Sequence, residues 1–405
     1  MKNNFKISIN QIKIFLLIFS IFTLLFFNAD YSVDSLRYVF AGKQFFENFL
    51  IFNLEPIVKQ ELNENKIFHQ NLDYSYPRRE FFTILPNIIF YISSIIFTDS
   101  LSYSIRIINL FLFSYAFIYT NKKYNPENEN KNLILIFFCY FGHYQVTGWN
   151  VKILPEILFF TICIFFFISI SNLKEVNFKK FFILLILSAA GFFTKPQGLI
   201  LLIVFSLVLI LYKFLKKNLI SILILMFFLY CLFLPVLLYL EIKNILDIPI
   251  ISIDNTALVH GDIISGWSNY FNGDLIHQKV RFDNKKLDLT QSYSFFDLVK
   301  ITLLRLFYFV VPYRFYESWL INLWNLTYFT ILYYGMANFF LKAKNNVNKN
   351  IYMLIFICIL SFHMFVPSTG TLRYQLSLIS LLFVVNFEYL NLQKDHEKQN
   401  ISTKI

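Results

Sequence analysis

Residues 153–171 read Ile153-Leu-Pro-Glu156-Ile-Leu-Phe-Phe-Thr-Ile-Cys-Ile-Phe-Phe-Phe-Ile-Ser-Ile-Ser171, an apolar run with one charged residue near its start. About 20 apolar residues are enough to cross the ~30 Å hydrocarbon core of a bilayer. The chain of 405 residues is 57% hydrophobic and has a mean hydropathy of +0.56. A soluble globular protein of this size does not need so much apolar surface. The sequence therefore predicts an all-α polytopic membrane protein.

Apolar runs of this kind recur along the whole chain. The others are 12–27, 81–97, 101–119, 133–148, 180–193, 198–214, 218–240, 299–312, 318–341, 351–366 and 375–390. If every run crossed the membrane, the lysine-rich loops would not share one side. They do share one side if 81–97 and 299–312, which Pro86 and Arg305 interrupt, lie on the outer face without crossing. We therefore predict a multi-pass protein of the inner (plasma) membrane with ten crossings and both termini cytoplasmic.

This topology divides the chain into three parts. Residues 1–240 are expected to form an N-terminal transmembrane module that includes a first outer loop, 28–100. Residues 241–317 form a large outer-face loop, and 318–405 form C-terminal transmembrane helices with a cytoplasmic tail. The net charge of +11 is then assigned to cytoplasmic loops near anionic lipid head groups, so we expect membrane lipids and no nucleic acid as partners.

Two acids follow the first apolar run directly. The stretch reads Asn28-Ala-Asp30-Tyr-Ser-Val-Asp34-Ser-Leu-Arg37-Tyr38-Val-Phe-Ala41. Acids where a chain leaves the membrane are costly unless they face water or a partner, so they mark a candidate functional site.

Arginine and lysine are distributed unequally under the predicted topology. The eight arginines all fall on or near the outer face: Arg37, Arg78, Arg79, Arg106, Arg281, Arg305, Arg314 and Arg373. The cytoplasmic loops use lysine only. Because the planar guanidinium grips phosphate with two hydrogen bonds, this asymmetry favours an outer cavity for an anionic, phosphorylated ligand. The alternative is that some of these arginines pair with acids in the loops.

Several predicted outer-face turns combine a helix-breaking residue with polar side chains. Glu156 lies just inside an apolar run and needs a cation or water. Lys152 and Lys195 are alternatively anchors whose ammonium groups reach the membrane surface, and a histidine at the position of His143 is more often packed than catalytic. No His, Cys or Asp cluster has metal-site spacing, and no glycine-rich phosphate loop is present.

The motifs resemble those of the GT-C superfamily of membrane glycosyltransferases, which includes protein O-mannosyltransferases and lipid A aminoarabinose transferases. Those enzymes carry an acid after the first span, with a tyrosine four residues later, as in Asp34-Ser-Leu-Arg37-Tyr38-Val-Phe-Ala41. The other similar stretches are Tyr76-Pro77-Arg78, Arg106, Leu154-Pro155-Glu156, Thr194-Lys195-Pro196 and Arg373-Tyr374. The likeness covers roughly 10–215 and the last turn. The family often has two adjacent acids, whereas Ser35 follows Asp34 here, which leaves open whether Asp30 supplies a second carboxylate.

The resemblance implies a GT-C-like bundle of about ten transmembrane helices with outer-face interfacial helices. It implies transfer of a sugar from a polyprenyl-phosphate-linked donor to an envelope lipid, glycan or protein acceptor on the periplasmic face. The implied catalytic residues are Asp34 as general base, with Asp30 and Glu156. The implied donor-phosphate residues are Arg37, Arg78, Arg79, Lys195 and Arg373, and the implied substrate-binding residues are Tyr38, Tyr76, His143, Lys152, Gln197 and Tyr374.

The sequence identifies no certain cofactor, and it leaves open whether Asp34 binds a divalent ion together with Asp30 or Glu156. Two other functions compete with sugar transfer. An O-antigen-type polymerase or ligase also has many spans and a basic outer loop, but its arginines cluster late in the chain. A transporter or flippase for a lipid-linked sugar would want charges near the bilayer midplane. The middles of the runs 133–148, 180–193, 218–240 and 351–366 are nearly free of charge.

Overall fold

The computed structural model describes most of the helical part of the chain and four short strands. The described residues are 7–27, 38–39, 41–43, 46, 83–96, 101–127, 129–148, 150, 155–171, 178–215, six positions between 223 and 231, strand residues between 262 and 281, 295–311, 318–343, 347–365 and 375–402. The chain divides into two compact units, residues 1–205 with 390–405 (unit 1) and residues 206–389 (unit 2).

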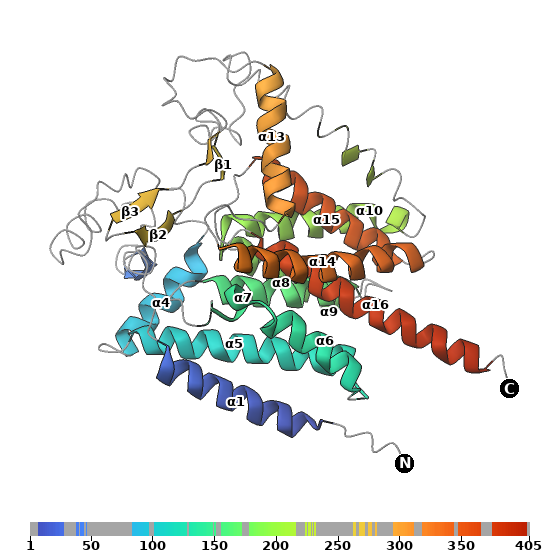
Figure 1. Ribbon diagram of the computed structural model, residues 1–405, viewed down its shortest axis with the longest axis horizontal. Helices are drawn as coiled ribbons and strands as arrows, with labels where there is room; N and C mark the ends of the chain where they lie inside the picture. Colours follow the sequence, from blue (N-terminus) through green and yellow to red (C-terminus); the bar gives the residue numbers. More distant parts are fainter. Residues whose placement is uncertain are drawn as a thin grey trace. The chain divides into compact units, whose positions relative to one another are not determined.

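Unit 1 is built from helices that follow the predicted apolar runs closely (Figure 1). They are α1 (Ile9–Phe26), α4 (Ile84–Ile96), α5 (Leu101–Tyr124), α6 (Asn130–Phe141), α7 (Tyr144–Gly148), α8 (Glu156–Ser171), α9 (Phe178–Phe192), the 3₁₀ turn η3 (Pro196–Gly198) and the start of α10 (Leu199–Leu215). The predicted run 133–148 is divided in two, because α6 ends before Gly142 and a separate short helix, α7, follows.

Both ends of α1 are closed by side chains. Ser8 Oγ accepts a hydrogen bond from the amide of Gln11, and Gln11 Oε1 accepts one from the amide of Ser8, which forms a capping box. At the other end, Arg106 of α5 donates from Nη2 to the carbonyl oxygens of Thr23 and Phe27 at 2.6 and 2.7 Å. A guanidinium is favourable there, since the last carbonyls of a helix lack partners and carry partial negative charge.

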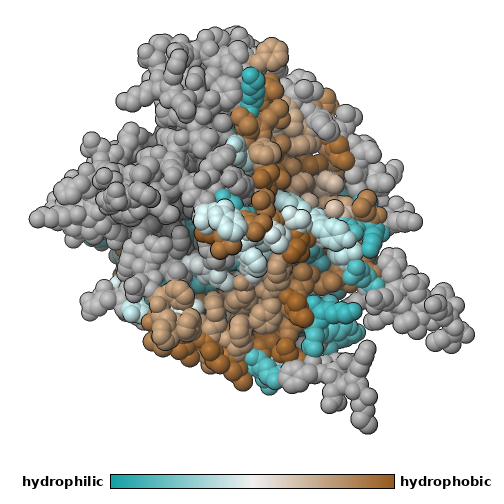
Figure 2. All heavy atoms as spheres, in the orientation of Figure 1, coloured by the Kyte–Doolittle hydropathy of each residue, from teal (hydrophilic) through white to brown (hydrophobic). Residues whose placement is uncertain are grey.

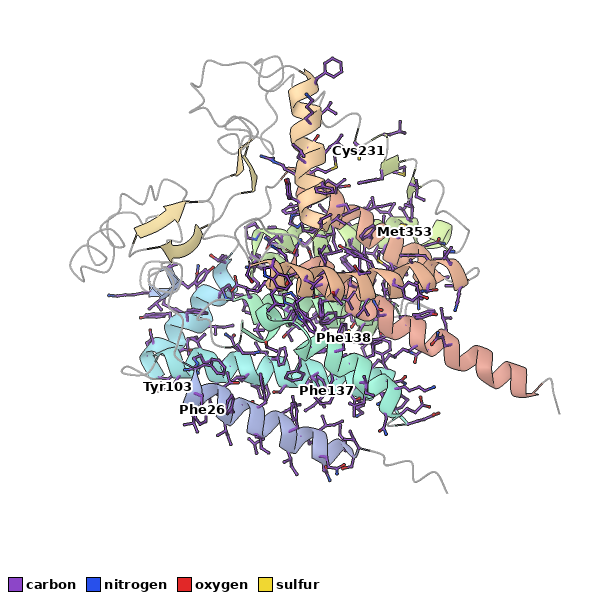
Figure 3. The ribbon with its side chains drawn as sticks, viewed as in Figure 1. Phe26, Tyr103, Phe137, Phe138, Cys231 and Met353 are labelled. Carbon is purple, nitrogen blue, oxygen red and sulfur yellow. The ribbon has the colours of Figure 1, made fainter. Side chains whose placement is uncertain are left out.

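The Arg106 contact fixes the direction of α5 relative to α1. The end of α1 lies beside the start of α5, so the two helices are antiparallel, and Figure 3 shows Phe26 and Tyr103 at the same end of the pair. The chain therefore leaves α1 and begins α5 at one end of unit 1. The intervening α4 has 13 residues, about 20 Å at 1.5 Å per residue, and α6 with 12 residues is of similar length, so length alone does not set α4 apart from the other short apolar helices.

The helices of unit 1 alternate in direction, and the lysines at their ends lie together at one end of the unit. The loop after α5 is closed by Asn125, which donates to the carbonyl of Glu129 and accepts from its amide at 3.1 and 2.7 Å. The lysines of the described turns and helix ends there are Lys13, Lys122, Lys123, Lys131, Lys179 and Lys180. Figure 2 shows hydrophilic atoms gathered where α1 begins and where α6 begins, beside a mainly apolar face.

The helix α8 is almost entirely buried. Only three of its residues are not buried (Leu158, Phe165 and Ser169), and its sequence is apolar on all sides. Helices of that composition are covered by other helices rather than by water. In contrast, α1 exposes Leu17, Ile18 and Leu25 by 60%, 61% and 73%, as expected of a helix at the edge of a membrane bundle.

Unit 2 contains the rest of α10, together with α13 (Phe295–Val310), α14 (Trp319–Lys342), α15 (Val347–Phe365) and α16 (Leu376–Ser402) as far as Tyr389. Residues 375–387 are all buried. Asn386 of α16 donates to the carbonyl of Leu332 in α14 at 2.9 Å, and the absence of a side chain at Gly335 makes room for it. A hydrogen bond from a polar side chain between two apolar helices is typical of membrane bundles.

Four short strands lie within the predicted large loop 241–317. Strand β1 (Asp262–Ile264) pairs antiparallel with β4 (Val280–Arg281), and β2 (Trp267–Phe271) pairs antiparallel with β3 (Asp274–His277). The predicted all-α class therefore holds for the membrane-type segments, while the loop adds two small strand pairs.

Four helices of the described residues are long and apolar enough to cross a membrane: Ile9–Phe26, Tyr103–Tyr124, Val347–Met364 and Leu376–Gln393. Shorter apolar helices include Ile84–Ile96, Asn130–Phe141 and Glu156–Ser171. The chain is thus a helical protein compatible with several membrane passes. Most of the predicted run 218–240 lies outside the described residues.

Candidate functional site

The feature of unit 1 with the clearest chemistry is an ion pair between Glu156 and Lys195. Lys195 Nζ donates to Glu156 Oε1 at 2.9 Å, and the two side chains expose only 7% and 1% of their surface. Glu156 is the first residue of α8, where the partial positive charge of the helix start also favours a carboxylate. Two residues predicted separately from different motifs therefore meet as one buried pair.

The turn that carries Lys195 is held by main-chain and side-chain bonds to the end of α9. Thr194 Oγ1 donates to the carbonyl of Ala190 at 2.6 Å, and the amide of Lys195 donates to the carbonyl of Gly191 at 3.2 Å. A side chain at Gly198 would collide with the main chain of Gly191. The sequence Thr194-Lys195-Pro196-Gln197-Gly198 thus forms a tight turn that fixes the lysine at the start of α8.

Gln197 belongs to the same turn and is also buried, at 3% exposure. Its Oε1 has no hydrogen-bond partner among the described residues. Buried amide oxygens are usually paired, so this acceptor is available to a donor from a bound molecule. Gln197 lies two residues after Lys195 in the same turn.

The helix α4 connects this turn to the segment that follows the first apolar run. The amide of Leu85 donates to the carbonyl of Phe193 at 3.0 Å, just before the Lys195 turn. Farther along α4, the ring of Phe90 meets the ring of Tyr38 edge-on, with centroids 5.2 Å apart. Tyr38 is buried and is the tyrosine four residues after Asp34 in the sequence. Described contacts therefore run from Tyr38 through α4 to the turn of Lys195.

The glycine at position 42 allows this contact between α4 and the Tyr38 segment. A Cβ atom at Gly42 would collide with the carbonyl oxygen of Asn87 and with the side chain of Tyr91. The backbone of the segment therefore lies directly against α4, and substitution with any larger residue would force the two apart.

His143 lies between α6 and α7 and is fully buried. Its carbonyl accepts from the amide of Thr147 at 3.2 Å, and Asn150 donates from Nδ2 to the carbonyl of Thr147 at 2.9 Å. His143 is thus buried at the end of α6, and its main chain forms part of the turn into α7. Asn150, which the sequence analysis did not select, is fully buried as well.

Arg106 does not act as part of an anion-binding set in this structure. Its hydrogen bonds go to main-chain carbonyls at the end of α1, so the interpretation of all outer-face arginines as ligand groups does not extend to it. Sequence reasoning missed this role because a helix end and an arginine about 80 residues later share no local pattern.

The other predicted site residues lie outside the described residues. They are Asp30, Asp34, Arg37, Tyr76, Arg78, Arg79, Lys152, Arg373 and Tyr374. Within the part of the chain that the structure describes, no three His, Cys, Asp or Glu side chains come together as metal ligands would.

Comparisons of the chain with protein-family models, with curated proteins and with solved structures gave no match in any of the three.

Proposed function

We propose that the chain is a membrane glycosyltransferase. It transfers a hexosyl or pentosyl group from a polyprenyl-phosphate-linked donor to an envelope lipid, glycan or protein on the periplasmic face. The observation that carries this proposal is the buried Glu156–Lys195 pair. A cation held at a fixed place by a buried carboxylate suits the stabilisation of an anionic leaving group.

The connection between motifs adds support. The resemblance to GT-C enzymes rests on an acid-tyrosine segment, a Leu-Pro-Glu segment and a Thr-Lys-Pro segment, which are far apart in the sequence. Described members of all three, Tyr38, Glu156 and Lys195, belong to unit 1 and are joined through α4 and the turn after α9. A shared active site requires that the three motifs lie close together, whereas three unrelated helix breaks would not need to be connected.

The proposal includes a topology of ten crossings with both termini cytoplasmic. In favour of it, the lysines of the described ends of α5, α6 and α9 lie at one end of unit 1, and the Glu156–Lys195 pair lies at the other. Under the positive-inside rule the lysine-rich end faces the cytoplasm. The ion pair then faces the periplasm, and α4 is a surface helix.

In the proposed reaction Asp34 accepts the proton of the acceptor hydroxyl or amine as this group attacks the anomeric carbon. The new bond to the sugar forms while the bond between the anomeric carbon and the phosphate oxygen breaks. The lipid phosphate leaves with the bonding electrons, and Lys195, with Arg37, Arg78, Arg79 and Arg373, stabilises its charge. Glu156 holds Lys195 in place, and Asp30 orients the acceptor.

Substitution of the proposed base tests the assignment. We expect Asp34→Asn to abolish sugar transfer in membranes without loss of expression. The assay follows radiolabelled sugar from a panel of polyprenyl-phosphate hexoses and pentoses into envelope material. Glu129→Gln, which also removes a carboxylate but lies in the loop between α5 and α6, at the end of unit 1 away from the Glu156–Lys195 pair, is the matched control and should retain activity. Near-normal product from Asp34→Asn would defeat the assignment.

A further inference from the structure

The helix α14 of unit 2 carries polar residues on its inner side and apolar residues on its outer side. Asn322 and Asn325 are buried, whereas Trp319, Tyr334 and Leu341 expose 76%, 70% and 78% of their surface. A helix that faces water shows the opposite arrangement. In a helical chain compatible with several membrane passes, an exposed apolar face indicates contact with lipid acyl chains. The other exposed apolar residues of α14 are Leu320, Leu323, Trp324, Leu326 and Ile331.

The two ends of this face carry residues that are typical of membrane interfaces. Trp319 and Trp324 lie near the start of α14, and tryptophan is enriched at the level of the lipid head groups. The helix has 24 residues, about 36 Å at 1.5 Å per residue, which matches a hydrocarbon core of ~30 Å with its borders. Lys342 is the last residue of α14 and its only charged one. Its ammonium group is therefore expected at the head-group level of the opposite interface.

Lys342 is held in place by an aromatic residue of α16. Its Nζ donates to the hydroxyl of Tyr389 at 3.0 Å and lies 5.3 Å from the centroid of the same ring, within the range of a cation–π contact. The lysine side chain is nevertheless exposed. An ammonium group has three N–H donors, and Tyr389 accepts from one of them. The positive charge is thus fixed in position and still accessible to an anion.

We infer that Lys342, held by Tyr389, binds the head-group phosphate of an anionic phospholipid whose acyl chains lie along α14. The anion present at the end of a lipid-facing helix is the lipid phosphate, and the apolar face that ends at Leu341 receives the chains. A zwitterionic lipid has an ammonium group of its own, which offsets the attraction, so Lys342 favours lipids with a net negative charge. The inference does not depend on the proposed sugar transfer.

Native mass spectrometry measures this lipid preference directly. The full-length protein in detergent micelles is incubated with equal amounts of phosphatidylglycerol and phosphatidylcholine that have the same acyl chains, and the retained lipids are counted. An exposed ion pair is worth a factor of up to about five, so we expect the wild-type protein to retain phosphatidylglycerol about fivefold over phosphatidylcholine. Lys342→Met should lose most of this preference. Lys342→Arg should keep it, because the guanidinium retains the charge and also binds phosphate.

Two further variants and a competitor complete the experiment. Lys123→Met is the matched control, since Lys123 is an exposed lysine in the last turn of α5, and it should leave the preference unchanged. Tyr389→Phe removes only the hydroxyl, so it should reduce the preference less than Lys342→Met does, and it keeps the test valid if Lys342→Met does not fold. An excess of inorganic phosphate should not displace the lipid, because it has no acyl chains to pack on α14.

Four results would overturn the inference. The first is a wild-type protein without preference for phosphatidylglycerol. The second is an equal loss of preference in Lys123→Met and Lys342→Met, which would mean a diffuse attraction to all lysines. The third is displacement of the lipid by inorganic phosphate. The fourth is a lowered melting temperature of Lys342→Met with unchanged lipid preference, because Lys342 would then only connect α14 to α16.

Discussion

The Glu156–Lys195 pair predicts a strong energetic coupling between two positions that are 39 residues apart. At 2.9 Å and an effective dielectric constant of about 20, the attraction is about 6 kcal/mol. Desolvation offsets part of this, and removing one partner of a buried pair costs about 3–5 kcal/mol because the other charge is left alone. We therefore expect Glu156→Gln and Lys195→Met each to lower the free energy of unfolding by about 3–5 kcal/mol.

The double variant should be more stable than either single variant. Replacing both charges with groups of similar shape leaves no unpaired charge, so the loss should fall to about 2 kcal/mol or less. The assay is unfolding of the full-length protein in mixed micelles, followed by circular dichroism, for all four members of the cycle. Lys131→Met, an exposed lysine at the opposite end of unit 1, should change stability by no more than about 0.5 kcal/mol. A loss of stability in the double variant that equals the sum of the losses in the two single variants would refute the reasoning.

Sugar transfer by the same double variant separates a functional pair from a structural one. If Lys195 stabilises the departing lipid phosphate, the double variant regains stability but transfers sugar at least 100-fold more slowly, because electrostatic groups of this kind are worth about 10²–10³ in rate. If transfer recovers together with stability, the pair only holds the helices together and the proposed role of Lys195 fails.

Further variants test the packing and the topology. Arg106→Leu should lower the free energy of unfolding by about 2 kcal/mol, since it removes charge-assisted bonds to the end of α1; an unchanged denaturation midpoint would contradict the capping role. Gly335→Ala should lower the free energy of unfolding by about 1–3 kcal/mol, because its Cβ would meet Asn386. Gly148→Ala, with nothing within 4 Å of its Cβ, should not destabilise the protein. Equal effects of the two variants in the same melting experiment would argue against the contact between α14 and α16. A cysteine at Asn128 should react with impermeant maleimide only from the cytoplasmic side, and labelling of intact cells from outside would overturn the ten-crossing topology.

Apolar runs were sufficient to place the helices but not all of their ends. The run 153–171 became α8 and the run 180–193 became α9, each within three residues at either end. The run 375–390 coincides with the apolar part of α16, and the helix continues to Ser402 through polar residues. Hydropathy identifies the part of a helix that lies in an apolar environment, and it carries no information about a helix that continues into water.

The candidate site could be predicted only residue by residue. Glu156 was recognised as an acid that needs a cation, and Lys195 as a lysine beside a helix break, but their pairing depends on how α8 and α9 pack. No local spacing encodes that contact. Arg106 shows the same limit. From the sequence alone, an arginine that binds carbonyl oxygens at the end of a helix, as Arg106 does at the end of α1, cannot be told from an arginine that binds phosphate.

The ion pair also has a consequence for biogenesis. On the proposed orientation both Glu156 and Lys195 must be carried across the bilayer during synthesis, and each charge alone costs about 2.5–3.5 kcal/mol at its centre. A hairpin in which the ammonium already neutralises the carboxylate avoids most of that cost. We therefore expect α8 and α9 to leave the translocon together as a helical hairpin. In that case α8 stays near the translocation channel until α9 and Lys195 have been synthesised.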